Sequence, residues 1–547
     1  MNTLIRNALI VNGDGETEPY AGDALIEGDR IVHLGEVPAS AASGADSTVD
    51  ADGLTLAPGF IDCHNHGALG GTRPGRNGIP VACENALLGG VTKRICGTDG
   101  LSPAPVAPEH RADYAALLKP LDGEIGEDWS WSTLEEFQAW HRGRSITDMG
   151  VHVGHSAVRR LVMGNAARKA TEDETRQMMA VIKREAPRAI GFSTGLIYNP
   201  AVFSDERELA ALIRAFNEVK PGGFFPHIRN ESDAILDAMG EAINAAIEGG
   251  GAYGNEHTKV GGPRNYDKIG QVEGLLTSAA DNVPSMENMY LYTAGSTTGD
   301  AIFPPEFRSG TRDEFMGHLR EPSSRRKMFE WIRSGSATWE NFIDFCGGLQ
   351  GIQIAGIKEG VGDAFLGKRL GDVAAARGFP DLDSFEAHNA VFDFFVENDG
   401  LITIISHHGD EPTVQRLFKR PTMAICTDGL MPGPGQKPHP RSIGAFPKAL
   451  RYARELGVPL KEIVYRMTAM PAAFFHIESP VLRPGADASL VLFDWERVRE
   501  LNDYEDPTIP PEGIERVWVH GTLVLEGGTF HIPDPYPGRI LQTVPVA

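Results

Sequence analysis

The sequence lacks a basic cluster, a long hydrophobic run and a signal-like beginning. Its 51 Lys and Arg stand against 74 Asp and Glu, which gives a net charge of −23 with no Lys/Arg block. This balance argues against a nucleic acid or an anionic membrane surface as a partner. Because no run reaches about 18 apolar residues, no membrane span is predicted. The start, MNTLIRNALIVNGDG, has no apolar core followed by a small-residue cleavage site, so we expect no signal peptide.

Cysteine is also scarce, with five residues in a chain of 547. So few cysteines in so long a chain do not predict a disulfide framework, and a reducing cytoplasm is the expected compartment. The hydrophobic content of 41% is ordinary for a soluble globular enzyme. The length exceeds that of one compact core, and it predicts a large domain with at least one smaller one.

Both ends of the chain are rich in short candidate strands separated by turns. Residues 1–57 contain LIRNALIVNG and DALIEGDRIVHLGEV, and residues 476–547 contain ADASLVLFDW and GIERVWVHGTLVLEGGTF. This pattern predicts one small β-sandwich domain assembled from both termini. The alternative is that the two ends are independent β segments.

The middle of the chain, residues 58–475, alternates between strand and helix patterns. One helical segment, TEDETRQMMAVIKREA, begins with a capping box of Thr171 and Glu174. Eight candidate strands are GFID before His64, VTKRI before Cys96, GVHV before Gly154, AIGFS near 190, GFFP before His227, AYGN before His257, NMYLYT near 290 and TMAIC before Thr427. Eight such units predict an α/β fold, a (β/α)8 TIM-type barrel. The stretch 295–420 is longer than a barrel crossover needs, and is either a lid or substrate-pocket insertion or packing decoration.

Six side chains that can bind a metal follow these strands. They are His64, His66, Cys96, His227, His257 and Asp428. Taken singly, each has an ordinary explanation: a hydrogen-bonded core histidine, an inert buried thiol, or an Asp-Gly turn. Their shared position is more informative, because a parallel barrel places its catalytic groups at the carboxyl ends of its strands. Together they predict a metal centre suited to zinc.

With these motifs, the chain resembles a known family, the N-acyl-D-amino-acid deacylases (D-aminoacylases) of the amidohydrolase superfamily. The resemblance runs nearly end to end, and its motifs include PGFIDCHNH, GGVTKRICGTDGLSPAP, GFSTGLIYNP, HIRNE, HTK, TDG and HPRSIGAFPKALRYARE. Two positions depart from the family pattern. Gly67 follows the HxH pair where an Asp is usual, and Asn255-Glu256 stands where a Ser-His pair is usual.

The resemblance implies a set of site residues. One zinc would be held tightly by Cys96, His227 and His257, and a second, weaker position would use His64, His66 and Asp428. The substrate carboxylate would be bound by Tyr198, Arg229, Lys259 and Ser296. A cation with a phenol and a hydroxyl can clamp a carboxylate, although Arg229 and Lys259 could instead form structural ion pairs.

The expected function is therefore zinc-dependent hydrolysis of the amide bond of N-acyl-D-amino acids, with Asp428 moving the proton. D-specificity follows from the resemblance alone. One alternative is a cyclic amidohydrolase of the hydantoinase or dihydroorotase type, with the same fold and metal chemistry. Another is a non-catalytic scaffold of the same fold, which the filled ligand positions argue against.

Overall fold

The fold is built around parallel strands that carry the predicted site residues at their carboxyl ends. The structure, a computed structural model, describes residues 2–124, 129–336, 339–431 and 433–544. Two parallel sheets contain these strands. The first consists of β6 (Phe60–Asp62), β7 (Val91–Cys96) and β8 (Asp148–Val151). The second consists of β9 (Val153–Gly154), β10 (Phe192–Gly195), β11 (Gly223–His227), β12 (Ala252–Asn255), β13 (Ser285–Met289) and β17 (Met423–Ile425).

The two sheets are joined at both edges. Between β8 and β9 lies only His152, so the two strands form one interrupted segment. At the other edge, Asn65 after β6 forms a parallel bridge with Gly429 after β17, and the backbone N–H of Asp428 donates to the carbonyl of His64 at 2.9 Å. The parallel pairings thus pass through all eight predicted strand positions and return to the first, which is the connectivity of a (β/α)8 barrel.

One strand lies earlier than the sequence predicted. The seventh strand was expected over NMYLYT near 290, but β13 ends at Met289. The chain leaves the parallel sheet at Tyr290 because it turns into β14 (Ala294–Thr298), which pairs in a different sheet.

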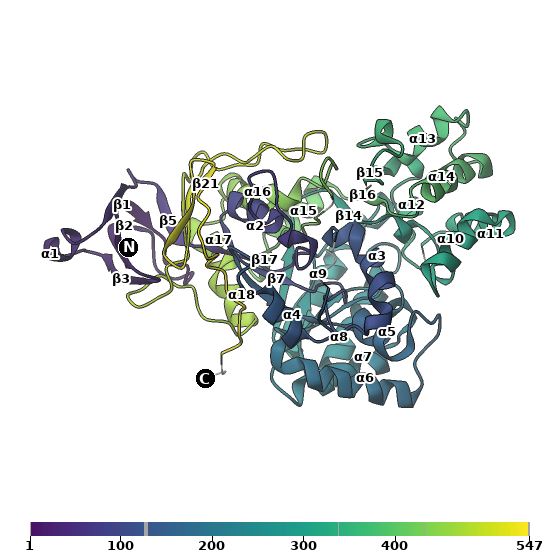
Figure 1. Cartoon of the computed structure of the whole chain (residues 1–547), viewed down its shortest axis with the longest axis horizontal. Helices are drawn as coiled ribbons and strands as arrows, with labels where there is room; N and C mark the ends of the chain where they lie inside the picture. Colours follow the sequence, from purple (N-terminus) through teal and green to yellow (C-terminus); the bar gives the residue numbers. More distant parts are fainter. Residues whose placement is uncertain (1, 125–128, 337–338, 432, 545–547) are drawn as a thin grey trace.

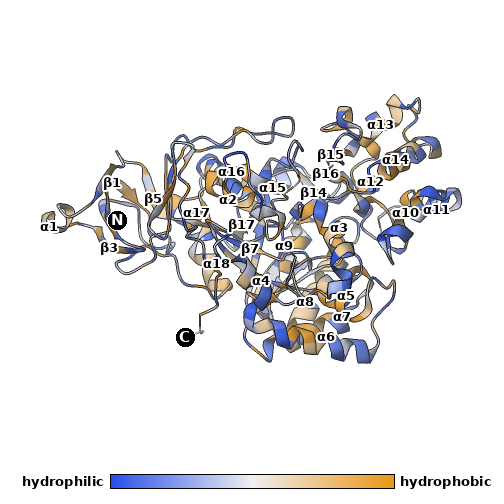
Figure 2. Ribbon diagram, in the orientation of Figure 1, coloured by the Kyte–Doolittle hydropathy of each residue, from blue (hydrophilic) through white to orange (hydrophobic). Residues whose placement is uncertain are grey.

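Helices follow the barrel strands and pack on the outside of the sheet (Figure 1). Thr171 and Glu174 form the predicted capping box at the start of α6, with hydrogen bonds of 3.2 and 2.8 Å. In Figure 2 these outer helices carry both hydrophilic and hydrophobic residues, as expected of helices buried on one side. They are α2 (Val81–Leu88), α5 (His155–Met163), α6 (Glu172–Glu185), α7 (Glu206–Asn217), α8 (Ile235–Gly249), α9 (Ile269–Asn282), α15 (Glu411–Phe418), α16 (Arg441–Leu456) and α17 (Leu460–Met467). Shorter or flanking helices include α3 (Arg111–Asp122), α4 (Leu134–His141) and α18 (Ala469–Phe474).

Between β13 and α15 the chain forms a separate unit. Its three strands, β14, β15 (Ile352–Gly356) and β16 (Thr403–His407), make an antiparallel sheet with β16 in the centre. Its helices extend away from the barrel at the upper right of Figure 1. They are α10 (Arg312–Arg320), α11 (Pro322–Ile332), α12 (Phe342–Phe345), α13 (Leu370–Ala376) and α14 (Phe385–Glu397).

Strands from both ends of the chain share one nine-stranded sheet. The two ends meet where β5 (Thr55–Pro58) pairs antiparallel with β18 (Leu490–Phe493). The other members are β1 (Asn2–Ile10), β2 (Tyr20–Glu27), β3 (Arg30–Gly35), β4 (Ser47–Asp50), β19 (Ile514–Val519), β20 (Thr522–Glu526) and β21 (Thr529–Phe530), and α1 (Ala39–Ala42) lies between β3 and β4. Its own small core includes Ile5, Leu56 and Trp518. The domain boundaries at 57/58 and 475/476 stay a prediction.

None of the described helices combines the length and the apolar character that crossing a membrane requires.

Candidate metal centre

Four histidines and two aspartates converge at the carboxyl ends of the barrel strands. His64 and His66 follow β6, Asp428 follows β17, and His227 is the last residue of β11. The remaining two are Asp99, three residues after β7, and His257, two residues after β12. All six side chains are buried. They form three overlapping groups of possible metal ligands, which are His64, His66 and Asp99, then His64, His257 and Asp428, and finally Asp99, His227 and His257.

The first set of neighbouring donors contains His64, His66, Asp428 and Asp99. The Nε2 atoms of the two histidines are 3.3 Å apart. Asp428 Oδ1 lies 3.5 Å from His64 Nε2 and 3.3 Å from His66 Nε2. On the other side, Asp99 Oδ1 is 3.6 Å from His64 Nε2 and Asp99 Oδ2 is 3.5 Å from His66 Nε2. Both aspartates therefore place carboxylate oxygens within 3.3–3.6 Å of the two imidazole nitrogens.

The second set contains His227, His257 and Asp99. His227 Nδ1 faces His257 Nε2 at 2.9 Å. Asp99 Oδ1 is 3.7 Å from His227 Nδ1 and 3.4 Å from His257 Nε2. This group supplies three donors from the protein, which leaves one coordination position for a water or a substrate oxygen.

These separations fit a shared metal ion. Zinc binds His nitrogen and carboxylate oxygen at about 2.0–2.2 Å, so two donors on one ion are about 2.8–3.6 Å apart at angles between square and tetrahedral. The donor atoms of both sets have spacings of this size. The residues present therefore fit a divalent metal, and their imidazole and carboxylate chemistry suits zinc.

Comparison with known proteins finds similarity to amidohydrolases and to D-amino-acid deacylases. A sequence model of the Amidohydrolase family matches residues 366–525. D-aminoacylase from Alcaligenes xylosoxydans xylosoxydans is 29% identical over 98% of this chain and 97% of its own length, and N-acyl-D-glutamate deacylase from the same organism is 29% identical over 99% and 96%. The crystal structure of N-acyl-D-glutamate deacylase from Bordetella bronchiseptica, complexed with zinc and a phosphonate inhibitor that mimics the tetrahedral intermediate, superposes with a TM-score of 0.79, 26% identity and 99% coverage of both chains.

The chain is similar over nearly its whole length to D-amino-acid deacylases, and over residues 366–525 to the Amidohydrolase family model. Its full-length similarity to D-aminoacylase and N-acyl-D-glutamate deacylase agrees with the resemblance seen in the sequence motifs.

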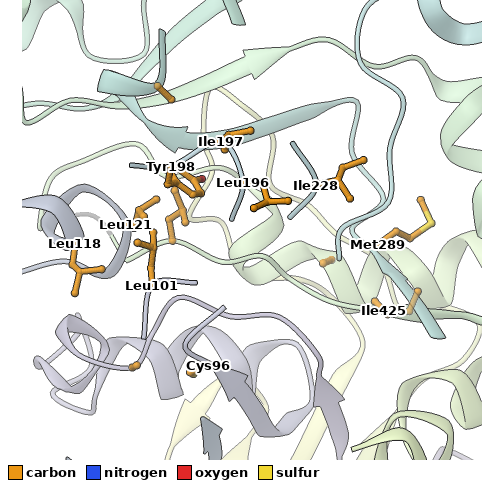
Figure 3. Packing of buried hydrophobic residues seen from close by; sticks show 14 of the residues in the cluster. Cys96, Leu101, Leu118, Leu121, Leu196, Ile197, Tyr198, Ile228, Met289 and Ile425 are labelled. Carbon is orange, nitrogen blue, oxygen red and sulfur yellow. The ribbon is translucent and has the colours of Figure 1, made fainter. Parts of the chain in front are cut away.

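Cys96 lies apart from the other predicted ligands, and its role in binding zinc stays a prediction. Its Sγ contacts Asn65 Oδ1 and an Arg94 nitrogen, each at 3.9 Å, and none of the ligand groups found among the described residues includes it. It packs instead in the main hydrophobic cluster (Figure 3). Burial raises the pKa of this thiol to about 12, so without a metal it stays protonated. Its neighbour in the GTDG turn, Asp99, occupies the position between the histidines.

A signal for Asp99 is present in the sequence. Thr98-Asp99-Gly100 repeats the Thr-Asp-Gly triplet of residues 427–429, and both triplets follow a barrel strand. Both aspartates adopt positive φ, 54° for Asp99 and 47° for Asp428, and His257 does so at 31°. Non-glycine residues rarely adopt this conformation, and those that do concentrate at functional sites.

Glu256 orients one of the histidine ligands. Its buried carboxylate bonds His64 Nδ1 and also accepts a hydrogen bond from Asn288 Nδ2 at 3.1 Å. With Nδ1 engaged, the Nε2 lone pair of His64 points toward the other donors. A carboxylate on the outer nitrogen of a ligating histidine is the usual second contact in metal sites. The departure from the family pattern at Asn255-Glu256 thus has a structural role.

Replacing Glu256 with Gln is expected to weaken zinc binding about 10- to 100-fold, because the neutral amide orients the imidazole less firmly and makes it less basic. Competition with a metallochromic chelator measures the affinity. Glu248→Gln, an exposed change on α8, serves as the matched control. Equal zinc affinity in Glu256→Gln and the control would contradict this role.

Arg229 is not placed to bind a substrate carboxylate. Its guanidinium forms a two-bond pair with Glu241 at 2.8 and 2.9 Å, and it also donates to the backbone carbonyls of Val202 and Ser204. The sequence predicted a substrate contact because Arg229 is two residues after His227. The loop after β11 instead directs the side chain to α8, where it forms a structural ion pair.

Replacing Arg229 with Met is therefore expected to lower the free energy of unfolding by about 1.5–3 kcal/mol, since it removes hydrogen bonds to a charged partner. The KM for substrate should stay within twofold of wild type at a temperature where both proteins are folded. Urea unfolding and steady-state kinetics measure the two quantities. A large rise in KM with unchanged stability would restore the predicted substrate role.

The other residues predicted to bind the substrate carboxylate lie near the metal centre, but each of them already has a hydrogen-bond partner. Tyr198 stacks edge-on against His227 with ring centroids 5.7 Å apart, and its hydroxyl bonds Thr297 at 2.7 Å. The Ser296 hydroxyl donates to the carbonyl of Ile404 at 2.7 Å. Lys259 Nζ bonds Glu231 at 2.6 Å and His257 Nδ1 at 2.7 Å. Of the predicted set, Lys259 is thus the cation that touches a ligand.

Two residues that the sequence did not single out complete this side of the site. Arg441, at the start of α16, is buried and places one guanidinium nitrogen 2.9 Å from Asp428 Oδ2. Its guanidinium also lies over the Tyr290 ring at 4.3 Å. The Tyr290 hydroxyl and the Arg441 Nε atom have no hydrogen-bond partner among the described residues. These unused donors can serve a bound ligand.

Proposed function

We propose that this chain hydrolyses the amide bond of N-acyl-D-amino acids and releases a carboxylate and a free D-amino acid, with zinc as its metal. The observation that carries the proposal is the buried group of four imidazoles and two carboxylates at the carboxyl ends of the barrel strands. D-aminoacylase and the N-acyl-D-glutamate and N-acyl-D-aspartate deacylases are relatives over nearly the whole chain. The preference for the D isomer rests on these relatives.

The chemistry divides between the metal and Asp428. A bound zinc supplies polarisation of the scissile carbonyl and lowers the pKa of a coordinated water toward about 7. Burial raises the pKa of Asp428, but Arg441 and His64 outweigh it and hold that pKa well below its usual range. Asp428 is therefore ionised at neutral pH and ready to accept the water proton, which it then passes to the departing amine.

Arg441, Lys259 and Tyr290 are the proposed binders of the substrate carboxylate. The Arg441 guanidinium and the Lys259 ammonium both lie over the Tyr290 ring, at 4.3 and 5.6 Å from its centroid. Two cations lie on one side of the metal ligands, beside a phenol that has no hydrogen-bond partner among the described residues. Such a group of donors can bind a carboxylate. The set predicted from the sequence was Tyr198, Arg229, Lys259 and Ser296, and Lys259 is common to both sets.

A carboxylate clamp favours a linear N-acyl amino acid over a cyclic amide. Hydantoins and dihydropyrimidines have no free carboxylate before hydrolysis, so a clamp gives them no binding energy. Assays of N-acetyl-D-amino acids beside hydantoins and dihydropyrimidines test this choice. Hydrolysis of the linear amides alone supports the proposal, and hydrolysis of the cyclic amides alone would replace it with the cyclic amidohydrolase alternative.

The proposed substrate is a small molecule, and the proposed compartment is the cytoplasm. The five cysteines are all free, which suits a reducing environment. At the metal centre, the His227, His257 and Asp99 group is the proposed tight zinc position, because it has three protein donors and one open coordination position.

A further inference from the structure

We propose that Glu340 positions His227 for metal binding: its carboxylate accepts the Nε2 proton of this imidazole and so selects the tautomer whose Nδ1 is free for a metal ion. Glu340 comes from the unit between β13 and α15 and lies just before α12. The inference rests on the proposed function, since it takes His227 as a metal ligand. It makes Glu340 a positioning residue that belongs to the insertion.

The two ring nitrogens of His227 face different surroundings. Nδ1 lies 2.9 Å from His257 Nε2, on the side of the other predicted ligands. Nε2 instead faces the carboxylates of Glu231 and Glu340, at 3.8 and 3.6 Å, and has no hydrogen-bond partner among the described residues. A neutral imidazole carries one ring proton. When Nδ1 offers its lone pair to a metal, that proton is on Nε2 and needs an acceptor there.

The Glu340 carboxylate is held at one oxygen and unused at the other. Its Oε1 accepts a hydrogen bond from the backbone N–H of Glu231 at 2.7 Å, which fixes the group in place. Its Oε2 lies 3.6 Å from His227 Nε2 and has no hydrogen-bond partner among the residues that the structure describes. Both side chains are buried, and an unpaired donor and acceptor are costly in such surroundings. A small closure of this gap satisfies both groups.

Glu231 is also close to His227, but it is engaged elsewhere. Its Oε1 accepts a hydrogen bond from Lys259 Nζ at 2.6 Å and lies 3.2 Å from His257 Nδ1. Among the described residues, by contrast, His227 is the only basic side chain within ion-pair distance of Glu340. The two carboxylates therefore serve different ligands. Glu231 acts with Lys259 at the outer nitrogen of His257, and Glu340 acts at that of His227.

Glu340 reaches the centre because its segment is fastened to the loop after β11. Asn230 Nδ2 donates to the backbone carbonyls of Ser336 and Trp339, at 2.9 and 3.3 Å. The bond between the Glu231 backbone and the Glu340 carboxylate adds a third contact. The sequence left open whether the stretch 295–420 is a lid or pocket insertion or packing decoration. On this inference it supplies a working part of the metal centre.

Replacing Glu340 with Gln should reverse the effect of the carboxylate. The bond from the Glu231 N–H needs an oxygen, so the amide has to place its NH2 group toward His227 Nε2. An NH2 group donates and cannot accept, so it favours the tautomer with the proton on Nδ1, which leaves no lone pair there for a metal. We expect zinc affinity to fall about 10- to 100-fold, the usual effect of losing the outer contact of a ligating histidine.

The test measures metal affinity in the full-length protein. Wild type, Glu340→Gln and Glu330→Gln are stripped with a chelator, and zinc is then titrated in competition with a metallochromic chelator. Glu330 is exposed on α11 of the same unit, so its variant should bind zinc as wild type does. Urea unfolding of the stripped proteins is followed in parallel, and the midpoints should be equal. A lower midpoint for Glu340→Gln with unchanged zinc affinity would mean a purely structural role and would overturn the inference.

Hydrogen exchange in the wild-type protein gives a second test that needs no variant. Zinc binding places the proton on His227 Nε2 and closes the gap to Glu340, so the backbone amides of residues 339–348 should exchange more slowly in zinc-loaded protein than in stripped protein. Slower exchange in the barrel strands with no change in residues 339–348 would overturn the inference, even if Glu340→Gln fails to fold.

The outcome is separable from that of the proposed function. Zinc affinity that depends on Glu340, in a protein that hydrolyses none of the N-acyl-D-amino acids, would support this role and reject the substrate. Deacylation by a protein in which wild type and Glu340→Gln bind zinc equally would do the reverse.

Discussion

Replacing Asp428 with Asn lowers kcat for an N-acyl-D-amino acid by about 10²- to 10⁴-fold, the usual contribution of a general base. The reason is geometric and electrostatic. Asp428 Oδ1 faces His64 and His66 at 3.5 and 3.3 Å, while Oδ2 is held by Arg441 at 2.9 Å. Asn keeps the shape but cannot accept a proton. Steady-state rates measure the loss, and Asp281→Asn on the exposed side of α9 is the control.

Metal analysis separates this role from ligand loss. The second set of donors does not use Asp428, so the variant should retain at least one tightly bound ion per chain. Wild-type turnover in Asp428→Asn would remove this residue from the mechanism. Complete loss of bound metal would show that Asp428 acts as a metal ligand. The residue that accepts the proton from water would then be unknown.

Replacing Arg441 with Met raises KM for an N-acyl-D-amino acid about 10- to 100-fold, because a hydrogen bond to a charged group contributes about 1.5–3 kcal/mol. Arg441 is buried beside Asp428 and over Tyr290, and its Nε atom has no partner among the described residues. The change removes the cation that we assign to the substrate carboxylate. Initial-rate kinetics over a range of substrate concentrations measure it.

The substrate itself provides the control for Arg441. An N-acyl-D-amino acid amide lacks the carboxylate, so Arg441→Met and wild type should have the same KM for it. An equal rise of KM for both substrates would mean that Arg441 acts through Asp428 and the metal site and not through the carboxylate.

The barrel could be predicted from the sequence because its strands are short apolar segments that end in polar residues. The positions of His64, His66, His227, His257 and Asp428 follow from that pattern, since each comes at or just after a strand end. The structure brings all five side chains together.

Asp99 was not among the residues predicted from the sequence, whereas Cys96 was. Cys96 is the last residue of β7, and its side chain packs in the hydrophobic cluster. The chain continues for three residues before the left-handed turn at Asp99 directs a carboxylate to the histidines. This turn decides that the Asp99 side chain faces the metal centre. The turn lies beyond the end of the strand, so the alternation of side chains along the strand does not predict it.

On the substrate side of the site, the residue predicted from the sequence and the contacts in the structure differ at Arg229. Proximity in sequence to His227 favoured Arg229, but that side chain pairs with Glu241 on α8. Arg441 is distant from the strand ends in sequence, and it reaches the centre because α16 begins next to the Asp428 turn. Only the packing of helices around the barrel determines such a contact.

The central claim is that zinc held by this centre hydrolyses N-acyl-D-amino acids. The most direct measurement is the release of free amino acid from paired N-acetyl-D- and N-acetyl-L-amino acids, with chelator-stripped protein and with zinc restored. The account predicts release from the D isomers alone, absent after stripping and recovered with zinc. Equal rates on both isomers, or full activity in metal-free protein, would contradict it.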